Sequence, residues 1–230
     1  MAALECFSPD ELRALADNPK RVKKHLAILV EEEIAGTFAS PLSDREVQSD
    51  YPQFAGKLAP WRKYAAYADY SGPIAWLVKK NFTLANAWQA GPCYSQLDYL
   101  KSWQFADAAT EDCLVFWVPR LAWDSTSKSV EEMKAFRCEL GKRFGLPDNH
   151  AVSFGSIQVL FALILAYFKF KGESVPFCLL NAASDSLRDD GTRLIAGNFT
   201  NCGLYCNCWI DDVGNDSIGF FLIGAEKLGK

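Results

Sequence analysis

The longest apolar segment of the chain lies in its last third. Residues 159–168 read VLFALILAYF and leave no polar face for a helix. A helix without a polar face must be covered by protein on most sides. Ser153 or Ser156 can cap such a helix at its N-terminus, and Gly172 suits the position after its last turn. The pattern therefore predicts a buried helix over about residues 156–171.

A membrane span is the alternative interpretation of this segment. A transmembrane helix needs about 20 consecutive apolar residues. Gln158 interrupts the apolar pattern on one side, and Glu173 follows closely on the other. The segment is too short, so we predict a core helix on which a sheet packs, and no contact with a membrane.

Strand-like segments follow this helix to the end of the chain. They are short, rich in aromatic residues and cysteine, and separated by turn signals such as Asp190-Gly191. Because short turns join successive strands, we expect a mainly antiparallel sheet that packs on the central helix. The predicted strands cover residues 177–181, 192–199, 204–211 and 217–223.

The earlier part of the chain is predicted to be mostly helical. Two helices are expected before residue 36, and a third begins at Ser129, where Ser129 and Glu132 form a capping box. A buried strand is expected at residues 113–118. The segment 61–103 is aromatic, and its periodicity does not decide between helix and strand.

Helices first and strands last is the α+β pattern. The chain carries no repeat, no low-complexity tract and no convincing linker. We therefore predict a single α+β domain over residues 1–230, with N-terminal helices and a central buried helix packed on a mainly antiparallel C-terminal sheet. A helix-rich, aromatic part covers residues 1–150, and the core helix and β-meander cover residues 151–230.

Composition and charge narrow the class of protein. Half of the residues are apolar and 13% are aromatic, which suffices for a sizeable core. The net charge of −4 argues against a nucleic-acid partner. The first residues, MAALECFSPDELR, have neither the basic nor the apolar region of a secretory signal. We therefore expect a soluble, cytoplasmic protein whose eight cysteines are reduced thiols.

Cys93 and His150 are the candidates for a catalytic pair. The other histidine, His25, is expected on the solvated face of an N-terminal helix. Gln89 precedes Cys93, and His150 lies in the sequence Asn-His-Ala-Val. These two short segments resemble the papain-like cysteine proteases, in which histidine lowers the thiol pKa and glutamine helps to hold the oxyanion. The preferred interpretation is a structural thiol and a polar residue at a helix entry.

Two further groups of side chains contain metal-binding residue types. Cys202, Cys206 and Cys208 lack the paired spacing of a thiolate zinc site, and small core residues are the preferred interpretation. Aspartates at the predicted strand ends can hold a divalent cation, but aspartate is also a usual residue of turns. They are Asp185, Asp189, Asp190, Asp211, Asp212 and Asp216. We predict neither a metal site nor a cofactor.

Aromatic residues are the remaining functional signal. The segment 61–103 holds more tryptophan and tyrosine than a core of this size requires, and both are enriched at protein interfaces and in ligand grooves. Packing of the N-terminal half on the sheet is the alternative. The candidate binding residues are Trp61, Tyr64, Tyr67, Trp76 and Trp88.

Three functions follow from these features. The sequence favours a non-enzymatic module that binds a protein partner or has a regulatory role. A cysteine-dependent hydrolase or transferase that uses Cys93, His150 and Gln89 is the first alternative. A carboxylate–metal enzyme at the strand ends is the second.

Overall fold

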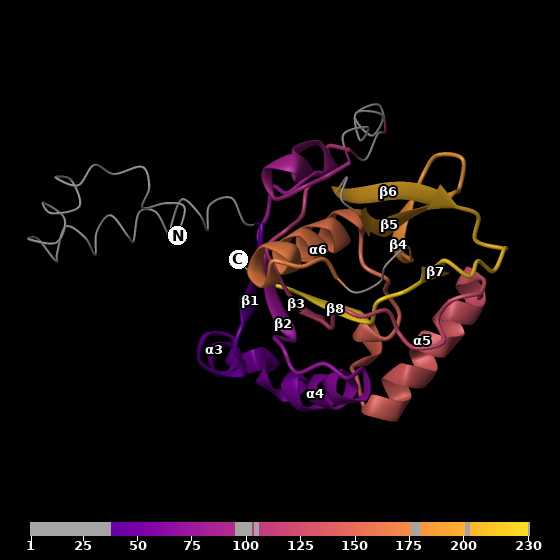
Figure 1. The fold of residues 1–230 in the computed structure, drawn as a ribbon. Helices are drawn as coiled ribbons and strands as arrows, with labels where there is room; N and C mark the ends of the chain where they lie inside the picture. Colours follow the sequence, from indigo (N-terminus) through magenta and orange to yellow (C-terminus); the bar gives the residue numbers. More distant parts are fainter. Residues whose placement is uncertain (1–37, 95–102, 104–105, 176–179, 201–202, 230) are drawn as a thin grey trace, which may run out of the picture. The chain divides into compact units, whose positions relative to one another are not determined.

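The computed structural model describes residues 38–94, 103, 106–175, 180–200 and 203–229. This part of the chain contains two four-stranded sheets (Figure 1). The first sheet has the order β1–β2–β3–β8 and is antiparallel throughout. Its strands are β1 Ala39–Leu42, β2 Ala75–Val78, β3 Cys113–Trp117 and β8 Ile223–Lys227. The second sheet has the order β6–β5–β4–β7, with a parallel pairing of β4 and β7. Its strands are β4 Asn181–Leu187, β5 Arg193–Thr200, β6 Gly203–Trp209 and β7 Ile218–Gly219.

The helix α6, Ile157–Lys171, lies between the two sheets (Figure 1). Ser156 caps it by accepting a hydrogen bond from Val159 N–H, and Gly172 ends it in the left-handed conformation. The predicted buried helix is therefore confirmed, together with its two caps. Among the described residues, no helix has the length and apolar character needed to cross a bilayer.

The side chains of α6 form one core with both sheets, which we call the α6 core. Residues 160–167 are all buried. They pack with Trp117 of β3 and Leu194 of β5, so the apolar pattern of the helix is explained by contacts on several sides. The prediction that a sheet packs on this helix is confirmed.

The opposite face of the first sheet is covered by α4, Leu58–Tyr67, and α5, Val130–Phe144. Successive side chains of a strand point to opposite faces of its sheet. In β3, Trp117 belongs to the α6 core, whereas Phe116 packs with α4 and α5 in a second group, which we call the α4–α5 core. The capping box of Ser129 and Glu132 starts α5, as predicted. Shorter helices are α3 Asp44–Asp50, η2 Pro52–Lys57, η3 Leu84–Gln89 and η5 Asp148–His150.

The α+β prediction is confirmed, but the segment 217–223 differs from its predicted single strand. β7 ends at Gly219, and the chain then passes from the second sheet to the first, where β8 begins. Residues 220–222 between them are buried, so apolar character alone does not reveal the crossover. The strand β1 is also missing from the prediction, because it contains Pro41 and proline disfavours a strand. An edge strand such as β1 tolerates proline.

Some predictions fall outside the described residues. They include the two N-terminal helices, most of the strand expected at 177–181, and Cys202. The single-domain organisation of the whole chain therefore stays a prediction. Four of the described cysteines are free thiols: Cys93, Cys113, Cys138 and Cys208.

Candidate functional site

The structure does not bring Cys93 and His150 together. Cys93 forms an isolated bridge with Leu204 and packs against the α6 core. His150 is completely buried on the other side of the first sheet, against Trp61 and Phe116 of the α4–α5 core. A general base must lie within hydrogen-bond reach of its nucleophile. The two residues are therefore not placed to exchange a proton.

Both ring nitrogens of His150 have other partners. Nε1 of Trp61 lies 3.0 Å from Nδ1, and Oε1 of Glu226 lies 2.6 Å from Nε2. An indole nitrogen can only donate, so Nδ1 accepts and Nε2 carries the proton, which it donates to Glu226. Burial lowers the pKa of His150, although the hydrogen bond to Glu226 acts in the opposite direction. This histidine is therefore held in its neutral form.

The thiol of Cys93 is not activated. Burial raises its pKa to about 12, so the nucleophilic thiolate is scarce at neutral pH. Gln89 is exposed at the end of η3. The predicted catalytic set of Cys93, His150 and Gln89 is thus not assembled in this structure.

Three of the strand-end aspartates, Asp185, Asp190 and Asp211, bind protein groups. Asp211 holds Arg193 with two hydrogen bonds of 2.6 and 2.8 Å. Asp185 and Asp190 accept hydrogen bonds from neighbouring loop residues. In the described part of the chain, no group of three or more His, Cys, Asp and Glu side chains has the arrangement of a metal site.

Most of the predicted aromatic binding residues belong to the core. Trp61, Tyr64 and Trp76 are at most 1% exposed, so they cannot contact a partner in this conformation. They fill the space between the first sheet and its helices, which corrects the prediction of a binding surface for these three. Tyr67 is half-buried at the end of α4, and Trp88 is 69% exposed on η3.

A further exposed tryptophan, Trp123, lies in the loop 118–129 between β3 and α5. Its side chain is 55% exposed. The loop is hydrogen-bonded to the residue directly after β7, because Ala122 N–H donates to the carbonyl of Phe220 at 2.9 Å. Phe220 N–H in turn donates to Oγ of the buried Ser125. Trp123 is therefore carried by a loop that is tied to the core on both sides of the indole.

The backbone of this loop has an unusual conformation. Asp124 and Ser127 have φ angles of +59° and +60°, which residues with side chains seldom adopt. Ser127 N–H donates to the carbonyl of Asn215 at 2.8 Å. Such conformations persist where surrounding contacts fix them, and they are concentrated at functional sites.

Trp123 stands beside aromatic residues at the C-terminal ends of α4 and α5. Its ring centroid is 6.5 Å from that of Tyr67, which is 5.1 Å from that of Phe144. The guanidinium of Arg143 lies 4.6 Å from the centroid of the Tyr67 ring. We call Trp123, Tyr67, Phe144 and Arg143 the Trp123 surface. Aromatic residues and arginine are enriched at protein interfaces.

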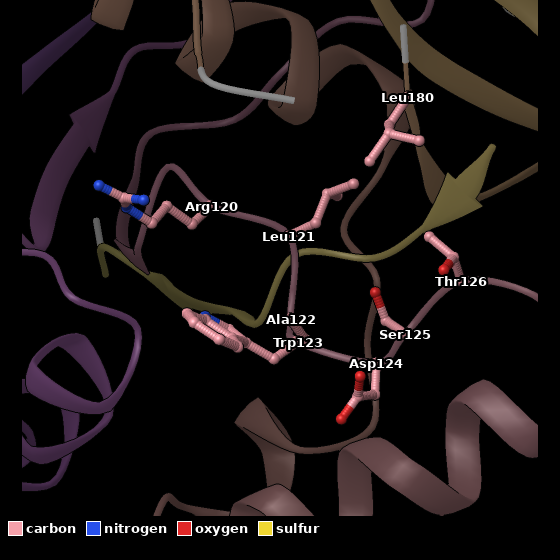
Figure 2. A pocket seen from close by; sticks show the side chains of 8 residues that line it. All are labelled: Arg120, Leu121, Ala122, Trp123, Asp124, Ser125, Thr126 and Leu180. Carbon is pink, nitrogen blue, oxygen red and sulfur yellow. The ribbon is translucent and has the colours of Figure 1, made fainter. Parts of the chain in front are cut away.

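A pocket of about 300 Å³ lies at the same loop (Figure 2). Its lining combines apolar walls, hydroxyl groups and two opposite charges. In Figure 2, Arg120 and Trp123 lie on one side of the view, and Leu180 and Thr126 lie on the other. The lining residues are Arg120, Leu121, Ala122, Trp123, Asp124, Ser125, Thr126 and Leu180.

The sequence contained part of the signal for this site. Trp123 is followed by Asp124-Ser-Thr-Ser-Lys128, a polar segment typical of a loop, where a large apolar residue is not needed for packing. The approach of Tyr67 and Phe144 to Trp123 depends on how α4 and α5 pack, which periodicity does not give.

Comparisons with protein-family models, with curated proteins and with solved structures found no match to this chain.

Proposed function

We propose that this chain is a non-enzymatic protein-binding module whose partner contacts the Trp123 surface. The observation that carries the proposal is the exposed indole of Trp123 on a loop with a fixed backbone. Tryptophan, tyrosine and arginine dominate the residues whose truncation weakens protein interfaces. The surface combines all three types with Phe144.

Preorganisation supports this assignment. Binding costs free energy when side chains and loops must be ordered. The ring of Tyr67 lies beside that of Trp123 and contacts Phe144 in turn. Phe144 contacts the buried Tyr64, with ring centroids 5.5 Å apart. The indole is thus connected to the α4–α5 core through Tyr67, and the backbone that carries it is already held by hydrogen bonds before a partner binds.

Exposure alone would not distinguish a binding residue, because single exposed apolar side chains are common. Trp88 provides the comparison. It is more exposed than Trp123, yet it has no ring contact among the described residues. Trp88 lies on η3, which packs with α6. Tyr67 and Phe144 lie at the ends of α4 and α5, which cover the other face of the first sheet. Trp88 is therefore remote from the aromatic residues beside Trp123.

Partner capture with matched variants tests the proposal. The wild-type chain, Trp123→Ala and Trp88→Ala are immobilised and exposed to an extract of the cells that produce the chain, after thermal unfolding has shown equal stability. We expect a protein that the wild type and Trp88→Ala retain and that Trp123→Ala loses. The purified partner should then bind Trp123→Ala at least about tenfold more weakly, the usual effect of truncating a central tryptophan. Equal retention by Trp123→Ala would overturn the proposal.

A further inference from the structure

Arg143 carries a positive charge that the described part of the chain does not neutralise. Its guanidinium lies 4.6 Å from the centroid of the Tyr67 ring and 5.3 Å from that of Phe144. The residue is exposed, and its side chain forms no ion pair or hydrogen bond with another described residue. A cation that lies over an aromatic ring keeps its charge and its N–H donors. Arg143 can therefore bind an acidic group from outside the chain.

The last turn of α5 offers a simpler explanation for Arg143, because a cation there offsets the helix dipole. The contacts indicate a further role. The carbonyl groups of Gly141 and Lys142 already accept hydrogen bonds from the backbone N–H of Gly145. Arg143 instead lies over Tyr67, which belongs to α4. Its charge is thus held within the Trp123 surface.

The guanidinium of Arg143 and the indole of Trp123 are neighbours of the same aromatic ring. The centroid of Tyr67 is 4.6 Å from the guanidinium carbon and 6.5 Å from the centroid of Trp123. These two distances limit the separation of the guanidinium from the indole to at most about 11 Å, which about three residues of extended peptide span. One segment of a partner can therefore contact both groups.

We infer that the partner binds the Trp123 surface through an acidic peptide segment, with an aspartate or glutamate on Arg143 and a large apolar side chain on Trp123. Arginine suits a carboxylate because it donates two parallel hydrogen bonds, and it stacks on aromatic rings while doing so. The acidic and the apolar residue of the segment lie within about three positions of each other. This inference rests on the proposed function, because it names the chemistry of the partner at the same surface.

Single-stranded nucleic acid is the other class of partner that aromatic rings and arginine bind, but it needs a positively charged groove along its backbone. Within the Trp123 surface only Arg143 is cationic. Asp124 follows Trp123 directly, Asp69 lies two residues after Tyr67, and both are exposed. The net charge of −4 also disfavours a polyanion. One carboxylate placed on Arg143 meets less repulsion from these aspartates than a chain of phosphates.

A random peptide library displayed on phage tests the inference, with the full chain as the immobilised protein. Selection on the wild type is followed by removal of the phage that also bind Trp123→Ala. We expect the remaining peptides to carry aspartate or glutamate within about three positions of a tryptophan, phenylalanine or leucine. A selected peptide synthesised with asparagine or glutamine in place of its acid should bind the wild type at least about tenfold more weakly.

Two variants remove the same charge from neighbouring exposed positions of α5. Arg143→Gln should weaken binding of the acidic peptide by about tenfold or more, because a charge-assisted hydrogen bond is lost. Lys142→Gln should weaken it by less than about threefold, since an exposed charge that is not in contact contributes little. The peptide that carries the amide should bind the wild type and Arg143→Gln equally, because its interaction with Arg143 is already absent.

The outcomes separate this inference from the proposed function. Failure to recover any peptide whose binding depends on Trp123 would contradict both. Peptides that depend on Trp123 but lack an acid, or whose binding is unchanged in Arg143→Gln, would overturn the inference alone. Oligothymidylate that binds the wild type more tightly than the selected peptides, and that Trp123→Ala does not bind, would assign the surface to nucleic acid and contradict both.

Discussion

Trp61 and His150 share a buried hydrogen bond of 3.0 Å, in which the indole N–H donates to Nδ1. The bond leaves the proton of the imidazole on Nε2, facing Glu226. The ring lies directly against Gly224 of β8, where a side chain would not fit. The histidine that the sequence nominates as a catalytic base therefore joins α4 and β8, and it does so only while neutral.

We expect the free energy of unfolding to decrease as the pH falls below 6.5, the ordinary pKa of histidine. Burial lowers the pKa of His150 in the folded chain. Near this pH the imidazole of His150 is therefore protonated in the unfolded chain but not in the folded chain. The contribution of the neutral His150 to the free energy of unfolding is complete above the pKa of histidine in the unfolded chain. It decreases as the pH falls towards the lower pKa of His150 in the folded chain. Urea unfolding at about pH 7.5 and about pH 5.5 measures the difference.

The variant His150→Gln is the control for this pH dependence. It should be less stable by about 1–3 kcal/mol at neutral pH, because a buried hydrogen bond is altered. Glutamine does not titrate, so the variant should lose less stability than the wild type between the two pH values. An equal loss in both proteins would assign the pH dependence to other groups and contradict the account of His150.

Alkylation tests the thiol-enzyme alternative. Iodoacetamide at neutral pH should modify Cys93 more slowly than free cysteine, because burial raises the pKa of this thiol to about 12. Peptide mapping by mass spectrometry gives the rate for each cysteine. The rate for Cys93 should be the same in His150→Gln, since the two residues do not interact. Rapid labelling that disappears in this variant would support the enzyme.

The position of α6 is tested by a charged substitution. Leu163 is fully buried in the α6 core. An unpaired carboxylate there costs several kcal/mol, a large part of the total stability of about 5–15 kcal/mol. We expect Leu163→Asp to lose its cooperative thermal transition. Lys171→Asp in the exposed last turn should cost only about 1 kcal/mol through the helix dipole. A wild-type melting temperature for Leu163→Asp would place α6 at the surface.

Local patterns in the sequence predict much of this fold. The helix α6 and its caps follow from an apolar segment between Ser156 and Gly172, and α5 follows from a capping box. The division of the strands between two sheets does not follow. Residues 217–223 look like one apolar strand, because the crossover from β7 to β8 is itself buried.

The site was harder to predict than the fold because exposure depends on packing between distant elements. Trp61 and Trp123 are the same residue type, yet one is fully buried and the other is 55% exposed. Trp61 faces the first sheet from α4, whereas Trp123 lies in a loop whose backbone is held by Phe220. Only the assembled fold distinguishes an aromatic residue of the core from one that can contact a partner.

Photo-cross-linking from position 123 tests the proposed function most directly. Trp123 or Trp88 is replaced by p-benzoylphenylalanine in the cells that produce the chain, and irradiation is followed by mass spectrometry of the adducts. Both positions are exposed, so the photoreactive side chain is accessible to a partner at either one. The account predicts a defined covalent adduct with another protein from position 123 and not from position 88. No adduct from position 123, or the same adduct from both positions, would contradict it.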